Sequence, residues 1–151
     1  MQGNNIIFKV KEATEEEIFD HLRACNTQFL PALDSRVEIH EYAKKLFKNA
    51  VTFEAWNAEI LAGLIATYFS DSRNKIAFVS NVSLLKDYQG LGLASSLLNQ
   101  CIDYARRCQF SEIRLEVDKN NTQAIALYTK FYFKDYETKE DQLQLVLKLK
   151  Q

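Results

Sequence analysis

Prolines and glycines, which usually mark linkers and tight turns, are scarce in this chain. One proline and four glycines occur among 151 residues, and no stretch rich in Ser, Gly or Pro separates one part of the chain from another. We therefore predict a single domain over residues 1–151, a length that can bury a full hydrophobic core. The 47% of hydrophobic and 26% of charged residues are ordinary globular proportions and exclude a disordered chain.

Residues that bind metals or form cross-links are also few. The three cysteines, Cys25, Cys101 and Cys108, form no CxxC pair, and the last two fall on one predicted helix that would bury them. Reduced thiols in a cytoplasm are the simplest account of this pattern. The two histidines, His21 and His40, lie in predicted N-terminal helices. We assign them no catalytic role and predict no metal site.

The chain also has neither an excess of charge of one sign nor a long apolar run. The formal net charge is −1, which gives no broad cationic field of the kind that the phosphates of a nucleic acid require. No apolar run approaches the ~18 residues needed to cross a bilayer, and no basic-then-apolar signal precedes the first predicted strand. We therefore expect a cytoplasmic protein that binds neither nucleic acid nor membrane.

Hydrophobic periodicity in the first half of the chain predicts a strand, two helices and three more strands. Ile6–Val10 favours a short strand, and Thr14 with Glu17 has the spacing of a capping box that opens the first helix. A second helix follows Arg36, where apolar residues return at helical spacing. Alternating apolar runs then predict antiparallel strands over 51–56, 60–69 and 76–84.

The second half of the chain alternates helices with single strands. An amphipathic helix is predicted over 94–109, because Leu97, Leu98 and Cys101 recur at helical spacing. The mixed-sign charged run over 134–141 is predicted to be a solvated hairpin loop. The other predicted elements are a strand around Leu115, a helix over 121–130, a strand that begins within 133–136 and a last strand over 143–149.

The sharpest feature is the turn between the third of the three strands and the long helix. It reads Tyr88-Gln89-Gly90-Leu91-Gly92-Leu93-Ala94. A glycine-rich turn from a strand into a helix points consecutive backbone N–H groups at one place, and the helix dipole adds positive potential there. Gly90 and Gly92 leave room for a pyrophosphate to approach, while the small Ala94 and Ser95 keep the first helical turn clear.

Two other phosphate-binding turns do not fit these residues. There is no GxxxxGK[ST], so a P-loop would lack its lysine and its metal-binding hydroxyl. The dinucleotide pattern GxGxxG fails because Ser95 occupies the last glycine position. A different phosphate-bearing cofactor is required, and the alternative is a glycine-bearing connection with no ligand.

The turn resembles the pyrophosphate loop of the GCN5-related N-acetyltransferase (GNAT) superfamily, Q/R-x-x-G-x-G/A, with Gln89, Gly92 and Ala94 at the fixed positions. The resemblance continues downstream, where Leu115-Glu116-Val117 and the run from Asn121 through Ala124 and Leu127 to Tyr128 are similar to the family's later motifs. It implies an α/β (α+β) fold with a mixed, mostly antiparallel sheet of six or seven strands, split near its middle and flanked by about four helices.

The same resemblance implies where acetyl-CoA would bind. The backbone N–H groups of residues 89–94 would hold the pyrophosphate, with Gln89, Gly90, Leu91, Gly92, Leu93, Ala94 and Ser95 as the cofactor-binding turn. Backbone groups near Val82 and Leu84 would pair with the pantetheine arm at the split, as an added strand would. Asn121 would contact that arm, and no metal is implied.

Catalysis by direct transfer to an amine needs an acid for the leaving thiolate and a base or water chain for the amine. The resemblance implies that Tyr128 is the general acid. Glu116 is the candidate base, because it alternates away from Leu115 and Val117 and lies at the family's spacing from the tyrosine. The alternative for Glu116 is a carboxylate that only bonds amide groups at the split, and Glu54 is a reserve candidate.

One position departs from the family pattern. Tyr132-Phe133 stands where the family usually has Gly-Phe, so the end of the helix over 121–130 is predicted to need a strained or different turn. The sequence predicts an N-acetyltransferase whose acceptor, a protein N-terminus, a lysine or a small amine, stays open, as does a possible homodimer. The alternatives are a CoA-binding regulatory module without turnover and an interaction domain whose loop binds nothing.

Overall fold

A computed structural model of the protein describes residues 5–149. Within that range a seven-stranded sheet has the order β1-β2-β3-β4-β5-β7-β6. Every neighbouring pair is antiparallel except β4 and β5, which are parallel. The strands are β1 Ile6–Val10, β2 Ala50–Asn57, β3 Ile60–Asp71, β4 Ile76–Leu84, β5 Glu112–Asp118, β6 Lys134–Lys139 and β7 Gln142–Lys148. The predicted mixed, mostly antiparallel sheet is confirmed.

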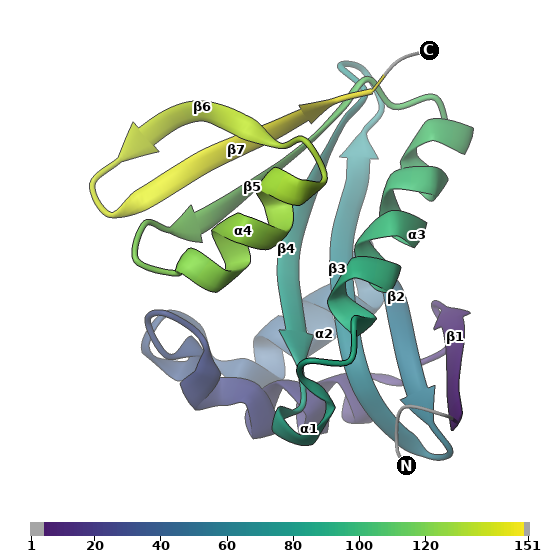
Figure 1. Ribbon diagram of the computed structural model, residues 1–151. Coiled ribbons are helices and arrows are strands. Elements are labelled where there is room, and N and C mark those ends of the chain that lie inside the picture. The colour runs from purple at the N-terminus through teal and green to yellow at the C-terminus, as the bar shows by residue number, and fades with distance from the viewer. Residues whose placement is uncertain (1–4, 150–151) are drawn as a thin grey trace.

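Four α-helices cover the sheet in the described range, two on each face (Figure 1). The helices are α1 Glu15–Cys25, α2 Ile39–Asn49, α3 Leu93–Arg107 and α4 Thr122–Lys130. The predicted capping box begins α1: Thr14 Oγ1 accepts from Glu17 N at 3.1 Å, and Glu17 Oε1 accepts from Thr14 N at 2.9 Å. Such a cap stabilises a helix by about 1 kcal/mol.

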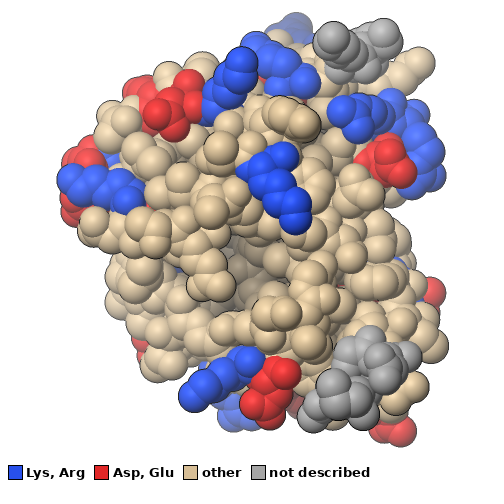
Figure 2. All heavy atoms as spheres, in the orientation of Figure 1, with Lys and Arg blue, Asp and Glu red and all other residues tan. Residues whose placement is uncertain are grey.

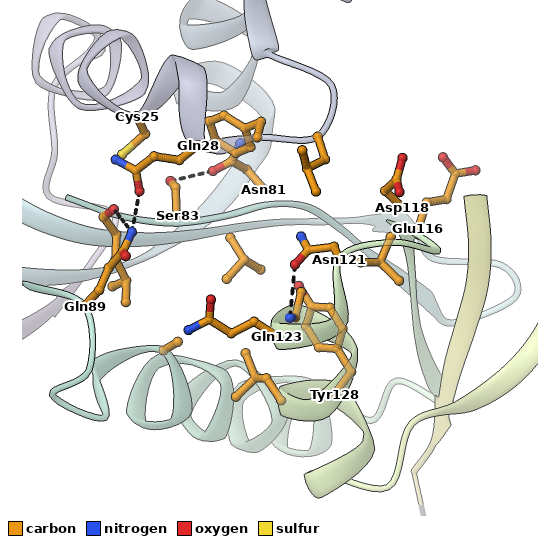
Figure 3. A pocket seen from close by; sticks show the side chains of 18 of the residues that line it. Cys25, Gln28, Asn81, Ser83, Gln89, Glu116, Asp118, Asn121, Gln123 and Tyr128 are labelled. Atoms are coloured by element: carbon orange, nitrogen blue, oxygen red, sulfur yellow. Dashed lines mark hydrogen bonds between the residues drawn. The ribbon is translucent and has the colours of Figure 1, made fainter. Parts of the chain in front are cut away.

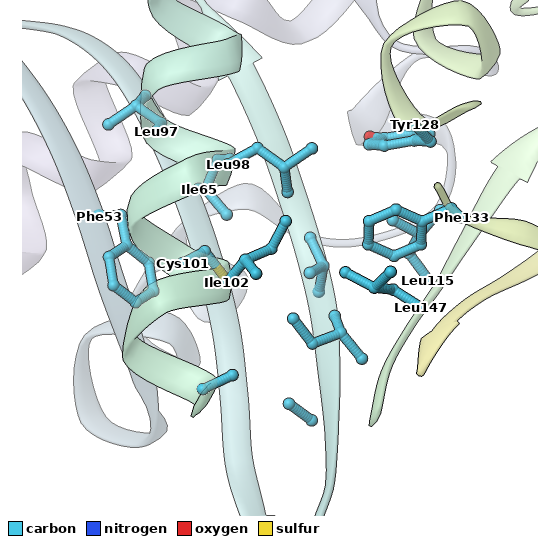
Figure 4. Packing of buried hydrophobic residues seen from close by; sticks show 14 of the residues in the cluster. Phe53, Ile65, Leu97, Leu98, Cys101, Ile102, Leu115, Tyr128, Phe133 and Leu147 are labelled. Atoms are coloured by element: carbon cyan, nitrogen blue, oxygen red, sulfur yellow. The ribbon is translucent and has the colours of Figure 1, made fainter. Parts of the chain in front are cut away.

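The main core lies between α3, α4 and the sheet (Figure 4). Leu97, Leu98 and Cys101 are fully buried on the inner face of α3, where burial of each large apolar side chain contributes about 1.5–3 kcal/mol. Tyr128 from α4 and Phe133 pack at the other end of the same cluster. A second cluster, which includes Ile18, Leu22 and Leu46, lies under α1 and α2 on the opposite face.

The sheet opens between its two central strands. Strand β4 pairs with β5 only over Ile76–Val79, opposite Glu112–Leu115. Beyond Val79 it continues to Leu84 along β3 alone, while β5 runs away from it together with β7 and β6 (Figure 1). A register shift between Ala66 and Thr67 of β3 leaves Ser80 as a bulge where the pairing with β5 stops. The predicted split is therefore present, and it exposes backbone of β4 toward the gap.

Two local predictions were wrong. The predicted strand that begins within 133–136 is present as the solvent-exposed edge strand β6. It extends to Lys139, however, so most of the run predicted as a loop is strand, and the hairpin turn is confined to residues 140–141. Cys108 is exposed, because α3 ends at Arg107 and places the residue after it beyond the helical face that packs on the sheet. For residues 134–139, pairing with β7 outweighs the polar composition that predicted a loop.

The end of α4 has the strained turn that the missing glycine predicts. Tyr132 has φ of 73°, a left-handed conformation that is unfavourable for any residue with a Cβ. The amide of Tyr132 donates to Thr129 O at 2.9 Å and that of Phe133 donates to Tyr128 O at 3.0 Å. These are the two hydrogen bonds of a Schellman motif, so Tyr132 occupies the position that usually holds glycine.

Candidate active site

A cleft of about 370 Å³ lies where the sheet opens. Figure 2 shows it as a hollow near the centre of this face, with uncharged atoms around most of its rim. Its walls are the free part of β4, the turn before α3, the start of α4, the end of β5 and the connection between α1 and α2. These segments are far apart in the sequence, and only the split in the sheet brings them together (Figure 3).

The turn before α3 presents unpaired backbone N–H groups to the cleft. Gly90 and Gly92 have φ of 80° and 79°, which glycine adopts without steric penalty. Gly92 is the N-cap of α3, and no side chain caps the helix. The first-turn N–H groups of a helix have no partner within it, and they carry the positive end of the helix dipole. A Cβ built on either glycine meets nothing within 4 Å, so the turn is open to a ligand.

The predicted cofactor-binding residues of this turn divide into two groups. Gln89, Gly90, Gly92, Leu93, Ala94 and Ser95 line the cleft. Leu91 does not line it, and its side chain is 45% exposed. The backbone N–H of Gln89 donates to Lys86 O at 3.3 Å, whereas its side chain donates to Leu84 O at 3.4 Å and to Gln28 Oε1.

The wall formed by β4 contains Val82 and Leu84, as predicted. Both side chains pack against the main core. The backbone edge of this part of β4 faces the gap without a partner strand, because the pairing with β5 ends at Val79. Asn121 lines the cleft opposite them, and its Oδ1 accepts from Ala124 N at 3.2 Å, so this side chain is also the N-cap of α4.

Tyr128 points into the cleft from α4 (Figure 3). Its side chain is 6% exposed, and burial raises the pKa of its phenol well above the ordinary value. No described residue forms a hydrogen bond with its hydroxyl, and its ring packs beside Phe133 with centroids 5.8 Å apart. At neutral pH the phenol is therefore protonated and its O–H is available to a ligand.

The two candidate bases lie in different places. Glu116 lines the cleft at the end of β5, and its Oε2 accepts from Gln144 Nε2 of β7. Glu54 is fully buried outside the cleft. Its carboxylate accepts from the backbone N–H groups of residues 12 and 13, from Thr52 Oγ1 at 2.6 Å and from Trp56 Nε1 at 2.9 Å. Glu54 therefore holds β2 to the segment before α1 and is not placed to act as a base.

A buried polar group behind β4 was missed by the sequence analysis. His21 Nδ1 lies 2.8 Å from Leu61 O and its Nε2 lies 2.9 Å from Ser83 Oγ. Ser83 lines the cleft with Asn81, and their side chains are 2.8 Å apart. Burial lowers the pKa of His21 to about 4 against smaller opposing effects of its hydrogen bonds to Leu61 and Ser83. The available signal was its position on the apolar face of α1, between Ile18 and Leu22.

Two further polar residues reach the cleft or its rim without any sequence signal. Gln28, which follows α1, meets Gln89 from the opposite wall. Lys130 of α4 donates from Nζ to Ser95 Oγ at 3.3 Å, which places a cation beside the open N-terminus of α3. Neither belongs to a motif, because each depends on the approach of two distant segments.

Comparison with known families identifies the chain. A model of the acetyltransferase (GNAT) family matches residues 15–133, well over half of the sequence. The chain belongs to this family. The match includes the glycine turn, the split strands and the helix that carries Tyr128, and it confirms the family that the two motifs indicated.

Solved structures of GNAT enzymes share the fold. The ribosomal-protein-S18-alanine N-acetyltransferase from Escherichia coli is 20% identical, with a TM-score of 0.73 and coverage of 94% of both chains. A Bacillus subtilis acetyltransferase in complex with CoA is 18% identical (TM-score 0.74; 95% of this chain, 99% of that one). The PaiA N-acetyltransferase from Thermoplasma acidophilum in complex with coenzyme A is 14% identical (TM-score 0.74; 95% and 99%). Comparison with curated proteins returns no match.

Membrane-spanning helices and metal-binding clusters are both absent from residues 5–149. None of the helices there is long and apolar enough to cross a bilayer. In the same range, no group of three or more His, Cys, Asp or Glu side chains is close enough together to hold a metal ion.

Proposed function

We propose that residues 1–151 act as one acetyl-CoA-dependent N-acetyltransferase domain that transfers acetyl directly to a primary amine. The observation that carries this proposal is a single cleft that contains an uncapped glycine turn, a strand edge without a partner and a free phenol. These are an anion site, a site for an extended amide-bearing chain and a proton donor, in the order in which they occur along acetyl-CoA.

The pyrophosphate would lie at the N-terminus of α3. The backbone from Gly90 to Ser95 offers N–H groups with no side-chain cap, and the helix dipole favours negative charge there. Lys130 adds a positive charge within reach of Ser95. Gln89 would contribute through its side chain, because its N–H is occupied by Lys86 O.

The pantetheine arm would run along the free edge of β4. Backbone groups near Val82 and Leu84 pair with its amides as a neighbouring strand would, and Asn121 faces them from α4. This direction carries the thioester from the turn toward the β-bulge at Ser80 and the phenol of Tyr128.

The transfer then needs one addition and one elimination. The amine nitrogen attacks the thioester carbon, and its proton passes to Glu116 directly or through water. A backbone N–H of β4 near the bulge at Ser80 donates to the oxyanion, because the thioester lies at that end of the free edge rather than near Leu84. The carbon–sulfur bond breaks, and the Tyr128 hydroxyl gives its proton to the sulfur. The phenolate recovers a proton through the cleft as CoA leaves, and Tyr128 is protonated again.

Calorimetry with acetyl-CoA tests the anion site. Gly92→Glu places a carboxylate in the proposed pyrophosphate cradle, so we expect the affinity to fall by more than 100-fold. Gly92→Ala adds only the strain of a positive φ, and Asn99→Glu adds the same charge to the exposed face of α3. Equal affinity of Gly92→Glu and Asn99→Glu would refute the proposed cradle.

Thiol release across a panel of amines tests turnover. Acetyl-CoA at 100 times its Kd should stabilise the protein by about 2.7 kcal/mol if the cleft binds it. Stabilisation with thiol release that depends on an amine supports the transferase. Stabilisation without turnover on any amine supports the regulatory module, and no stabilisation contradicts both.

A further inference from the structure

The wall of the cleft nearest the β-bulge combines hydroxyl groups with a cation. Ser80 lies at the bulge, and Tyr42 Oη of α2 donates to Ser80 O at 3.1 Å and lies 2.6 Å from Ser80 Oγ. Tyr68 Oη is buried near Tyr42, and its geometry gives it no hydrogen-bond partner among residues 5–149. Arg36, which precedes α2, lines the cleft beside them.

Arg36 has no ion pair with any described residue. Its charge nevertheless acts on this wall: burial raises the pKa of Tyr42, and hydrogen bonds to Ser80 and Asn81 together with the Arg36 guanidinium oppose that rise. A guanidinium with a free face beside hydroxyl donors is a suitable partner for a carboxylate, which it can bind with two parallel hydrogen bonds.

A different segment of the cleft's lining carries the opposite charge. Glu116 and Asp118, at the end of β5, line the same cleft (Figure 3). Arg36 is the only cationic side chain, and these two are the only anionic ones, among the described residues that line the cleft. A ligand with an amino group at one end and a carboxylate at the other matches both walls.

We propose that the acetyl acceptor is a small amine that also carries a carboxylate, as a free amino acid does, with Arg36 and Ser80 binding the carboxylate and Glu116 and Asp118 facing the amine. This inference rests on the proposed acetyl transfer. A simple amine would leave Arg36 without a counterion. An acceptor whose second group carries two negative charges would be repelled by Glu116 and Asp118, which line the same cleft. Electrostatic complementarity of this kind selects among acceptors more than it raises affinity in general.

Matched pairs of acceptors test the proposal. Each free amino acid of a panel is compared with its own carboxamide, which removes the negative charge and preserves the size. The carboxamide has the less basic amine, so more of it is uncharged at neutral pH, and a preference for the acid cannot arise from amine ionisation. We expect kcat/KM to favour the acids by at least 10-fold, with the acetylated product verified by mass spectrometry.

The variant Arg36→Gln should reduce this ratio to near one, mainly through a higher KM for the acids. Arg73→Gln, at an exposed arginine of the β3–β4 turn that does not line the cleft, should keep the wild-type ratio. Peptides that begin with an acidic residue form a third arm. Higher kcat/KM for such peptides than for free amino acids would overturn the proposal in favour of a protein acceptor.

The outcomes separate this inference from the proposed function. Turnover of carboxamides as fast as acids overturns the acceptor class and leaves acetyl transfer standing. If no amine is acetylated, calorimetry on the CoA-bound protein compares an N-acetyl amino acid with its carboxamide. Tighter binding of the acid that is lost in Arg36→Gln supports the carboxylate site, and equal binding refutes it.

Discussion

The Tyr128 hydroxyl, our proposed proton donor, is buried and has no hydrogen-bond partner among residues 5–149. Burial raises its pKa, which favours the protonated form until a strong acceptor approaches. A thiolate that forms in the cleft is such an acceptor. The transfer leaves a phenolate, which burial disfavours, so the phenol must quickly recover a proton through the cleft. In the proposed transfer, the Tyr128 side chain would contribute chemistry only when the carbon–sulfur bond breaks.

Replacement of Tyr128 by phenylalanine should therefore slow turnover more than it weakens binding. We expect kcat to fall by roughly 100-fold, at the low end for a lost general acid because a thiolate is a good leaving group. The KM for acetyl-CoA should change by less than about 3-fold, since no ground-state contact of the phenol is removed. Steady-state kinetics with Tyr132→Phe, at an exposed tyrosine, supply the control. Wild-type kcat in Tyr128→Phe would exclude the phenol from the mechanism.

At the scale of elements, two short turns determine where the site forms. The turn before α3 uses glycine at both positive-φ positions, and the result is a helix N-terminus open to an anion. The turn after α4 lacks glycine, and Tyr132 adopts a positive φ instead. That turn fixes the direction in which Phe133 returns to the core beside Tyr128. The strain therefore lies in the connection that positions the helix carrying the proposed general acid.

The variant Tyr132→Gly should stabilise the protein. A left-handed conformation costs a residue with a Cβ about 1–2 kcal/mol, and the more flexible unfolded chain of the glycine variant offsets part of that gain. The side chain is 79% exposed, so little packing is lost, and we expect a net gain of about 1 kcal/mol in chemical denaturation. Tyr132→Ala keeps the Cβ and should gain nothing. Equal stability of the glycine and alanine variants would show that the turn is not strained.

At the scale of the whole molecule, the open sheet divides the chain into two wings that share the main core. The first wing contains β1 to β4 and the second β5 to β7, and they are joined by the short parallel pairing of β4 with β5 and by α3. Side chains from both wings line the cleft. A ligand that binds in the cleft would therefore contact both wings and stabilise their arrangement relative to each other.

The buried His21 should make global stability fall in mild acid. Its pKa is lowered to about 4 by burial, from an ordinary 6.5. Between these values the unfolded state binds more protons than the folded state, so stability is full above pH 6.5 and is lost as the pH falls toward 4. The loss amounts to roughly 3 kcal/mol.

Urea denaturation from pH 7 to pH 4 measures this dependence. The variant His21→Gln should be less stable at pH 7, where it loses the hydrogen bonds to Leu61 and Ser83, but its stability should fall less over the range. His40→Gln, at an exposed histidine stacked on Phe19, should keep the wild-type slope. The same slope in His21→Gln as in the wild type would show that other groups dominate acid unfolding.

The sequence by itself determined what depends on local spacing. Periodicity gave β1 and β4 at their true bounds and the other elements within a few residues, and the glycines and Tyr128 were found through motifs. Only the tertiary structure decided which distant residues face one another. The pairing of β4 with β5 ends at Val79, which opens the cleft that Arg36 and Gln28 line. Glu54 instead is buried and accepts hydrogen bonds away from the cleft. Strand register and helix docking depend on contacts between residues far apart in the chain, and no local pattern encodes them.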